Sequence, residues 1–457
     1  MIAFMVAGTA SGVGKTTAAL AMMAALRERG LAVQPFKCGP DFLDAGHHSA
    51  VCGRVSRNLD TWMLSAEANR DIFHSASQGA DAAIVEGMMG LYDGVAGGGE
   101  AGSSAEIAKL LNLPVVLVLD ASKSARSIAA VTKGFEVFDR DLRFAGIVLN
   151  GVNSEGHYRL LEAALSSSTG IPLLGRLPKQ KAVSIPERHL GLRTAEEETA
   201  PDARREALAA MAREHLQLEP LLRLQHAAEI APAPVPLPAP IVRYGVTRDQ
   251  AFSFCYEDNL DLLRRAGAEI VPFSPLSDAH LPGDLDGLYL CGGYPELYAD
   301  RLHANASMMA EIRAFAESGR PVYAECGGML YLSQGLRSAD GQIFPMTGML
   351  PMRFEMTNSL VRFGYADVEF TGDCLPAIKG ATARGHSFHY SQMVEDCSLP
   401  SACRVKYSLS GRTEDEGFQL QNVYASYIHL HFGSCPSIAE SLVRSAAVAR
   451  RNAEVLS

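Results

Sequence analysis

Gly8-Thr-Ala-Ser-Gly-Val-Gly-Lys-Thr-Thr17, directly after the apolar run 2–6, is the stretch of sequence that decides the fold. A glycine-rich turn between a strand and a helix presents backbone N–H groups and a helix amino terminus to an anion, and its lysine adds positive charge. The pattern predicts a phosphate-binding loop, although five residues rather than the usual four separate Gly8 from Gly14. The alternative is a glycine-rich turn without a ligand. The predicted nucleotide-binding residues are Gly12, Gly14, Lys15, Thr16 and Thr17.

Short apolar runs alternate with helix-like stretches through the first half of the chain. Residues 16–29 and 105–111 are expected helices, and the charged, Ala- and Leu-rich residues 194–228 also predict helix. The alternation is typical of a doubly wound α/β fold, in which helices cover both faces of a parallel sheet. The expected strands are 2–6, 31–36, 82–85, 114–120, 145–150 and 172–177.

Ala231-Pro-Ala-Pro-Val-Pro-Leu-Pro-Ala-Pro240 interrupts this pattern. Alternating prolines cannot continue a helix or enter a central strand, and they favour a stiff polyproline II spacer. Apolar runs resume after it and later become shorter, which predicts a second α/β domain with added antiparallel strands. We therefore expect a phosphate-loop domain over residues 1–230, a linker over 231–240 and a second domain over 241–457.

Charged residues follow two of the expected strands. Lys37 and Asp41 come after the second strand, and Glu86 and Asp93 come after the third. The carboxyl ends of strands in a doubly wound sheet converge on one crevice, and Mg²⁺ prefers hydroxyl and carboxylate oxygens. Thr16, Asp41 and Glu86 are therefore the predicted Mg²⁺ ligands, with loop or capping carboxylates as the alternative. Lys37, Asp41 and Asp93 are the predicted substrate contacts. Further candidates for substrate carboxylates, or for a solvated charged face, are Arg54, Arg57, His47 and His48.

A second candidate site surrounds Cys326, which lies between the apolar run 322–324 and two glycines. A sharp strand-to-helix turn favours a nucleophilic cysteine, because the helix amino terminus stabilises thiolate. Backbone N–H groups of Gly292, Gly293 and Gly327 are the predicted oxyanion donors. His429 and His431 share one face if their segment is extended, so either is a candidate base. The alternative is a small buried thiol, which is our interpretation of Cys291.

Composition narrows the classes of partner and compartment. The net charge is −10, which argues against a nucleic-acid backbone as principal partner. The apolar amino terminus is far shorter than the roughly 20 residues of a membrane span. Nine cysteines without a CxxC pair favour a reducing cytoplasm. Small-molecule ligands are the expectation, and a homodimer is one assembly left open.

Seven motifs together carry a resemblance to the cobyrinate a,c-diamide synthase family over essentially the full chain. They are Gly8–Thr17, Lys37–Asp41, Val85–Gly94, Gly292–Glu296, Ala324–Gly328, Gly385–Ser391 and Ser426–Phe432. The first half also resembles dethiobiotin synthetase, whose phosphate loop has the same longer spacing. The second half is similar to class I glutamine amidotransferases of the branch without the usual acidic third catalytic residue. That acidic residue would stand two positions after His429, where this chain has His431.

The resemblance implies a ligase that uses ATP, Mg²⁺, L-glutamine and a corrinoid polycarboxylate. The first domain would convert the a and c carboxylates of cobyrinate or hydrogenobyrinate into acyl phosphates. Cys326 and His429 would act as a dyad that releases ammonia from glutamine. Amidation of nickel-sirohydrochlorin and cobyric acid synthase activity stay open as alternatives, although the run Gly385–Ser391 looks more like the diamide synthases. A regulatory or partitioning ATPase is the alternative from another class, and it would need neither Cys326 nor His429.

Overall fold

The chain forms two units, each organised around its own sheet. The computed structural model describes residues 1–95, 99–185, 187–188, 191–192, 194–226, 236–394 and 398–456. The units comprise Met1–Pro234 and Val235–Ser457. Half of the predicted linker, residues 231–235, lies outside the described residues. The limits of the linker therefore stay a prediction.

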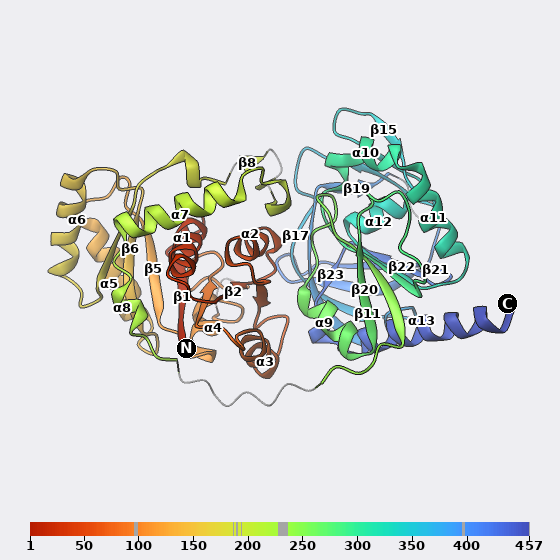
Figure 1. Cartoon of the computed structure of the whole chain (residues 1–457), viewed down its shortest axis with the longest axis horizontal. Coiled ribbons are helices and arrows are strands. Elements are labelled where there is room, and N and C mark those ends of the chain that lie inside the picture. Colours follow the sequence, from red (N-terminus) through yellow and green to blue (C-terminus); the bar gives the residue numbers. More distant parts are fainter. Residues whose placement is uncertain are drawn as a thin grey trace. The chain divides into compact units, whose positions relative to one another are not determined.

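The first unit contains a parallel sheet, in which the described residues form seven strands (Figure 1). Because all these strands are parallel, their carboxyl ends meet at one edge, and the loop after β1 lies at that edge between the ends of β4 and β5. The doubly wound prediction is confirmed. In sheet order the strands are β3 (Arg57–Leu59), β2 (Val33–Cys38), β4 (Ala82–Glu86), β1 (Ile2–Gly8), β5 (Val115–Asp120), β6 (Phe144–Asn150) and β7 (Leu173–Leu177).

Alternate residues of β1 pack on opposite faces of this sheet. Phe4 and Val6 belong to the core beneath α1 and α7, whereas Ala3 and Met5 belong to the core beneath α3 to α6 (Figure 1). Both faces are therefore buried, as expected for a parallel sheet. The helices are α1 (Lys15–Glu28), α2 (Phe42–Cys52), α3 (Ala66–Ala76), α4 (Ser104–Leu110), α5 (Ser127–Phe138), α6 (Glu155–Ser166), α7 (Pro201–His215) and α8 (Glu219–Leu222).

One sequence prediction in this unit needs correction, and one short strand was not predicted. The continuous helix expected from residue 194 is divided into α7 and α8, and Pro201 occupies the first turn of α7, where a missing N–H is tolerated. The three-residue strand β3 was not predicted, because a segment this short leaves no periodic pattern. A further pair of two-residue strands is β8 (Glu187–Arg188) and β9 (Gly191–Leu192).

The second unit contains a mixed sheet, in which the described residues form ten strands (Figure 1). The strands from β11 to β22 in sheet order are parallel, and those from β22 to β23 are antiparallel. This confirms the added antiparallel strands. In sheet order they are β11 (Ala268–Phe273), β10 (Val242–Thr247), β12 (Gly287–Leu290), β13 (Val322–Glu325), β22 (Val423–Ser426), β21 (Thr413–Leu420), β20 (Ser401–Tyr407), β17 (Arg362–Phe370), β18 (Thr382–His389) and β23 (His429–Leu430).

Helices cover both faces of the parallel part of this sheet. Leu288 and Leu290 of β12 pack with α10 to α12, and Tyr289 packs on the other face with α9 and α13. A smaller sheet has the order β15 (Ile343–Pro345), β14 (Gly335–Arg337), β16 (Arg353–Met356) and β19 (Ser391–Met393). The helices are α9 (Glu257–Arg265), α10 (Ala299–Ala304), α11 (Ala306–Glu317), α12 (Gly327–Leu332) and α13 (Ser437–Leu456).

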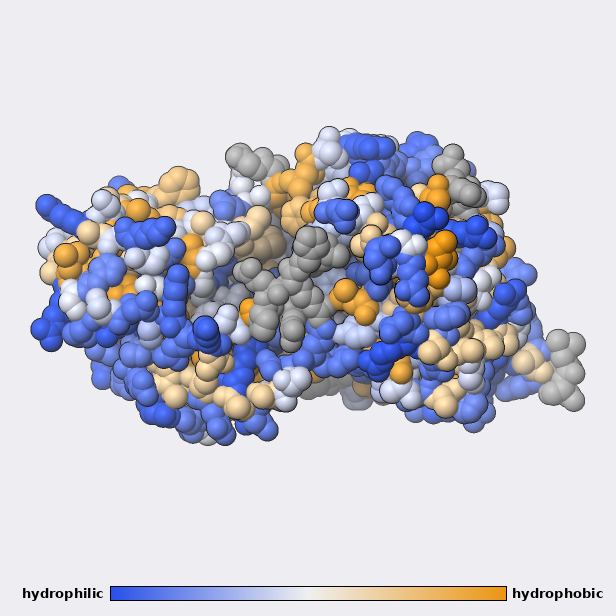
Figure 2. Space-filling view, turned by 90° about the horizontal axis from the view of Figure 1, so that it is seen from above, coloured by the Kyte–Doolittle hydropathy of each residue, from blue (hydrophilic) through white to orange (hydrophobic). Residues whose placement is uncertain are grey.

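One face of the surface is mainly hydrophilic. Figure 2 shows hydrophilic residues over most of the face in view, with hydrophobic residues in small groups between them. None of the helices in the described residues is both long enough and apolar enough to cross a bilayer.

Candidate active sites

The loop after β1 has the backbone geometry that a phosphate-binding turn requires. Gly12 has φ 76° and Gly14 has φ 96°, both in the left-handed region that favours glycine. A Cβ on Gly14 would lie 2.2 Å from Asn150 Nδ2, and the same Nδ2 donates a hydrogen bond to Val13 O at 2.9 Å. Asn150, at the end of β6, therefore holds the loop in place. Sequence reasoning missed this residue.

Lys15 and Thr17 lie in the first turn of α1, which begins at Lys15. Lys15 Nζ donates to Ala10 O at 2.8 Å, so the side chain folds back over the loop. Burial and the neighbouring charge of Lys37 lower the pKa of Lys15. An anion bound in the loop would offset both effects, because negative charge favours the protonated ammonium.

A buried cluster of charged groups lies beside the loop. Thr16 Oγ1 donates to Glu86 Oε1 at 2.7 Å. Lys37 Nζ donates to Glu86 Oε1 at 2.8 Å and to Asp44 Oδ2 at 2.5 Å. The second oxygen of Glu86 lies 2.6 Å from His48 Nε2. Burial alone would lower the pKa of Lys37, but Asp44 and Glu86 outweigh it and raise that pKa well above its ordinary value. The lysine is therefore a permanent cation held by carboxylates.

The sequence predicted that Asp41 would help to bind Mg²⁺ and substrate. In the structure Asp41 caps a helix, and Asp44 lies closer to Thr16 and Lys37. Asp41 Oδ1 accepts from Asp44 N at 3.0 Å and caps α2, while its other oxygen lies 3.8 Å from Lys37 Nζ. Asp44 Oδ2 instead lies 3.3 Å from Thr16 Oγ1. Sequence reasoning missed Asp44, and it proposed His48 only as a substrate contact, not as a partner of Glu86. Their spacing from Asp41, three and seven residues along one helix face, is the signal that could have found them.

The remaining substrate candidates of this unit make contacts within the protein. Asp93 Oδ2 accepts from Gly90 N at 2.8 Å and closes the turn after β4, although the residue itself is exposed. Arg54 is directed to Gln34 Oε1 and to two backbone carbonyls, each at 2.9 Å. His47 is buried, with its Nδ1 3.3 Å from the Arg204 guanidinium. Arg54 and His47 therefore support the fold in this structure.

The oxygen atoms beside Thr16 suit a magnesium ion that also binds phosphate. The donors are one hydroxyl and the carboxylates of Glu86 and Asp44, which is the hard oxygen chemistry that Mg²⁺ prefers. Within the described ranges, no group of three or more His, Cys, Asp or Glu residues is arranged to hold a metal alone. Such a sparse donor set fits an ion that nucleotide phosphates help to coordinate.

Cys326 forms the entire turn between β13 and α12. Its backbone has φ 45° and ψ −104°, a conformation that non-glycine residues rarely adopt. Cys326 N donates to Ser426 O at 2.7 Å, which ties the turn to the end of the neighbouring strand β22. A Cβ on Gly328 would lie 2.3 Å from Leu290 O, so only glycine fits there. Burial raises the pKa of the Cys326 thiol, which opposes the stabilisation of thiolate by the helix amino terminus.

The three predicted oxyanion glycines do not occupy equivalent positions. Gly292 N donates to Phe254 O at 3.1 Å, so its N–H is engaged in the backbone and does not fit the predicted donor role. A Cβ on Gly292 would lie 2.2 Å from His429 Cε1, so this glycine makes room for the imidazole. A Cβ on Gly327 would lie 3.0 Å from Gly293 N, which brings these two residues together beside Cys326. Gly293 and Gly327 are therefore the better candidates for donors.

His429 and His431 are both buried but face different groups. His429 is paired with His386 across β18 and β23, and the two rings stack with centroids 4.8 Å apart. The ring of His431 instead packs against Tyr256, at 4.6 Å. His431 Nδ1 accepts from Gly433 N at 3.2 Å. Gly293 lies beside the Cys326 turn, and its neighbour Gly292 lies against the imidazole of His429. His429 is therefore near the thiol turn, and the structure favours it over His431 as the base. Burial lowers the pKa of His429 to about 3, which keeps the imidazole neutral.

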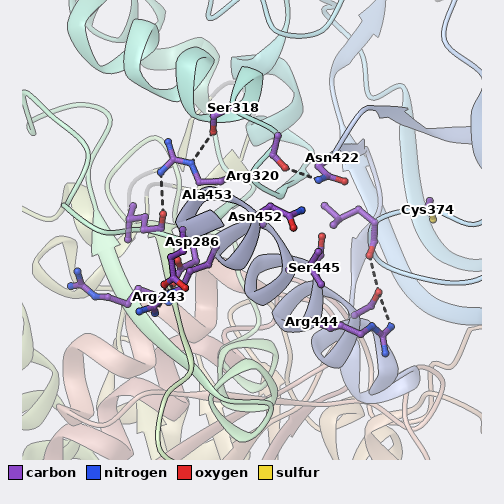
Figure 3. Close-up of a pocket in the computed structure, with 18 of the residues that line it drawn as sticks. Arg243, Asp286, Ser318, Arg320, Cys374, Asn422, Arg444, Ser445, Asn452 and Ala453 are labelled. Carbon is purple, nitrogen blue, oxygen red and sulfur yellow. Dashed lines mark hydrogen bonds and ion pairs between the residues drawn. The ribbon is translucent and has the colours of Figure 1, made fainter. Parts of the chain in front are cut away.

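An open cavity of about 1380 Å³ lies elsewhere in the second unit and is lined in part by residues of α13 (Figure 3). Its lining includes Arg243, Asp286, Arg320 and Asn422, which precede or begin β10, β12, β13 and β22. These are the amino ends of the strands, whereas Cys326 follows the carboxyl end of β13. The cavity is therefore separate from the thiol site.

Comparisons with known proteins match both units of the chain. Residues 4–192 match the CobQ/CobB/MinD/ParA nucleotide binding domain, and residues 243–436 match the CobB/CobQ-like glutamine amidotransferase domain. A cobyrinate a,c-diamide synthase of Leptospira interrogans is 42% identical, with 96% of this chain and 97% of the relative covered. One from Syntrophotalea carbinolica is 43% identical over 96% and 97%, and one from Salmonella typhimurium is 42% identical over 97% and 98%.

A solved structure titled "Crystal structure of glutamine amidotransferase" also aligns, with a TM-score of 0.32 and 18% identity over 44% of this chain and 98% of that one. The full-length relatives and the two domain matches decide the assignment. The chain belongs to the cobyrinate a,c-diamide synthase family and is an amide-forming ligase with a glutamine amidotransferase domain.

Proposed function

We propose that the chain amidates the a and c carboxylates of cobyrinate, using ATP and the amide nitrogen of glutamine. The observation that carries this proposal is the presence in one chain of the Thr16–Glu86 phosphate-loop site and the Cys326 turn beside His429. Full-length relatives named for this reaction support the choice of substrate. A regulatory or partitioning ATPase would not account for the amidotransferase domain at residues 243–436.

The first unit would activate the carboxylate. A carboxylate is a poor electrophile at neutral pH, so its oxygen attacks the terminal phosphorus of ATP and ADP leaves. Ammonia then attacks the acyl phosphate carbon and expels inorganic phosphate, which leaves an amide. Lys15 and the loop N–H groups stabilise charge on the phosphoryl group in flight. Thr16 and Glu86, with Asp41 or Asp44, would hold Mg²⁺, which supplies further neutralisation of phosphate charge when bound.

The second unit would supply the ammonia. The neutral His429 accepts the thiol proton as Cys326 Sγ bonds to the amide carbon of glutamine, and the Gly293 and Gly327 N–H groups face the resulting oxyanion. His429 returns the proton to the nitrogen as the C–N bond breaks and ammonia leaves. Water then hydrolyses the glutamyl thioester to glutamate. Because burial keeps both Cys326 and His429 neutral at rest, proton transfer accompanies the attack.

The reaction belongs in a reducing compartment, and we propose the cytoplasm. Cys326 must stay a free thiol to act as a nucleophile. Every cysteine in the described part of the chain is free, and Cys326 is among them. Lys37 remains a proposed contact for phosphate or substrate, although Asp44 and Glu86 engage it in this structure.

The test is incubation of the purified chain with ATP, glutamine and one ring at a time: cobyrinate, hydrogenobyrinate or nickel-sirohydrochlorin. Mass measurement of the ring reports the number of amides, and NMR of the product reports their positions. We expect two amides, at a and c, on cobyrinate. Amidation of nickel-sirohydrochlorin alone, or of other side chains as in cobyric acid synthase, would replace the proposal, and no turnover with any ring would end it.

A further inference from the structure

Glu325 lies directly before Cys326 and is fully buried. It is the last residue of β13, a strand flanked by β12 and β22 in the middle of the sheet. Its side chain has 0% exposure. A buried carboxyl group at this position is expensive unless other groups satisfy it. The reaction proposed above does not use Glu325. Its hydrogen-bond partners and neighbours therefore indicate what it does.

Three donors hold the Glu325 carboxyl group in one orientation. Tyr323 Oη donates to Oε1 at 2.8 Å, and Tyr289 Oη donates to Oε2 at 2.9 Å. The backbone N–H of Leu430 also donates to Oε1, at 3.2 Å. The last bond comes from the residue after His429. The carboxyl group therefore connects the strand that carries the nucleophile to the strand that carries the base.

The same carboxyl group faces the imidazole of His429. Glu325 Oε2 lies 3.8 Å from His429 Nδ1, and both side chains are at most 2% exposed. One face of the imidazole stacks on His386, and Gly292 leaves no room at Cε1. The ring is thus enclosed on several sides, and Glu325 defines its Nδ1 side.

We propose that Glu325 is the positioning residue for His429, in place of the acidic residue that this chain lacks two positions after the histidine. The inference rests on the proposed glutaminase function of Cys326 and His429. Glu325 does not touch glutamine. It fixes the backbone of the histidine strand through Leu430 and presents a carboxyl group to Nδ1, so that Nε2 faces the thiol. The distance of 3.8 Å is longer than a hydrogen bond, as is common before substrate binds.

The protons balance without any further reagent. The thiol proton of Cys326 moves to His429 Nε2 as the sulfur–carbon bond forms, and it moves on to the leaving nitrogen as the carbon–nitrogen bond breaks. Nδ1 keeps its own proton throughout, facing Glu325. A carboxylate there stabilises the imidazolium that exists between the two transfers.

The titratable groups around Glu325 make this role visible in a pH profile. Burial raises the pKa of Glu325 to about 8, and the three donors only partly oppose the shift. The phenols of Tyr289 and Tyr323 face it with pKa values well above the ordinary range, and burial also raises the pKa of Cys326. His386, behind His429, has a pKa well below its ordinary value because it is buried. His389, which also acts on His429, has a pKa lowered by burial to about 4, so as pH rises through about 8 Glu325 gains charge while the neighbouring histidines stay neutral.

The experiment measures glutamine hydrolysis by the full-length chain and by Glu325→Gln between about pH 6 and about pH 9. The wild-type kcat should rise through about pH 8, as the carboxylate forms. Glu325→Gln should lose this rise, with kcat at least about 10-fold lower at pH 8 and KM for glutamine within about two-fold. Glu325→Asp keeps a carboxylate but withdraws it from Nδ1, so its kcat should fall while the rise remains.

Glu416→Gln is the matched control. Glu416 is also buried, its pKa is raised by burial to about 7, and it accepts hydrogen bonds from Ser426 Oγ and Tyr427 N at 2.6 Å. It thus supports the same chain segment through other residues. Glu416→Gln should keep the rise near pH 8.

Wild-type kcat and an unchanged pH rise in Glu325→Gln would overturn the role of Glu325, and so would loss of the rise in Glu416→Gln alone. If Glu325→Gln does not fold, as judged by circular dichroism, Glu325→Asp decides: loss of its pH rise contradicts the proposal. Absence of glutamine hydrolysis in the wild type, or its persistence in Cys326→Ser, would instead overturn the glutaminase function itself.

Discussion

The two candidate sites both begin at a glycine-rich turn between a parallel strand and a helix. Buried groups beside the first turn are charged, whereas buried groups beside the second are mainly neutral. The phosphate loop spans residues 9–14 after β1, and its tip is exposed. The thiol turn consists of Cys326 alone and is buried. The longer turn presents several N–H groups to a ligand, whereas the shorter one places a single side chain at its apex.

The buried groups beside each turn explain the difference. Lys37 is buried with carboxylate partners, and its pKa is raised, so it stays charged. His429 and Glu325 are buried largely among uncharged groups, and burial moves their pKa values to about 3 and about 8, so both are mainly neutral at pH 7. Fixed charges suit the binding of phosphate and a metal ion, while neutral groups of shifted pKa suit proton transfer. The same local fold therefore suits two different chemistries, because the groups around it differ.

The largest expected effect is that one substitution abolishes the activity of the thiol site and leaves the activity of the phosphate-loop site intact. Cys326→Ser should lower glutamine hydrolysis at least about 10³-fold, because the nucleophile is lost. Amide formation from free ammonia should continue, since it needs only the first site. The assay measures glutamate release and ammonia-dependent amidation side by side. Cys291→Ser, a buried thiol before Gly292, is the control and should keep most of both activities. If Cys326→Ser still hydrolysed glutamine, Cys326 would not be the nucleophile and the two sites could not be assigned separate reactions.

The reciprocal change is Lys15→Ala. Amidation from either nitrogen source should fall at least about 10²-fold, because a charge that faces the phosphoryl group is lost. Basal glutamine hydrolysis should persist. Lys109→Ala is the control, since Lys109 pairs with Asp139 and Glu100 and lies outside the loop. Equal loss of both activities in Lys15→Ala would show that the two sites are not independent in the way described.

A smaller effect tests the space around His429. Gly292→Ala should lower glutamine hydrolysis by about 10-fold to 10²-fold, because a Cβ 2.2 Å from His429 Cε1 must displace the imidazole. Gly283→Ala, in the same unit, meets nothing within 4 Å and should leave the rate unchanged. Comparable rates in the two variants would mean that the position of His429 is not restricted by Gly292.

The smallest effect distinguishes the two aspartates of the first site in urea denaturation. Asp44→Ala leaves Lys37 short of a buried partner and should lower the free energy of unfolding by about 3 kcal/mol. Asp41→Ala removes a helix cap and should cost about 1 kcal/mol. Equal losses would indicate that the charge cluster adds little beyond the cap.

Local patterns carried most of what the sequence could predict. Three features depend only on residues close together in the sequence: the phosphate loop, the Cys326 turn and the alternation of strands and helices. The predicted fold class is confirmed. Asn150 and Glu325 could not be found this way, because their partners in the loop and on β23 lie far away in sequence. Gly292 was assigned as a donor, since a sequence does not reveal that Phe254 O already accepts its N–H. Asp44 was within reach, because helical spacing from Asp41 indicates it.

The central claim is that the thiol site releases ammonia and the phosphate-loop site uses it to form the amide. The most direct test follows the source of the amide nitrogen. Cobyrinate and ATP are incubated with glutamine labelled with ¹⁵N in its side-chain amide, or with labelled ammonium, using the wild type and Cys326→Ser, and the ring is analysed by mass. We predict two labelled amides from either source with the wild type, and from ammonium only with Cys326→Ser. Labelled amides from glutamine in Cys326→Ser would contradict a thiol site that feeds ammonia to the phosphate-loop site.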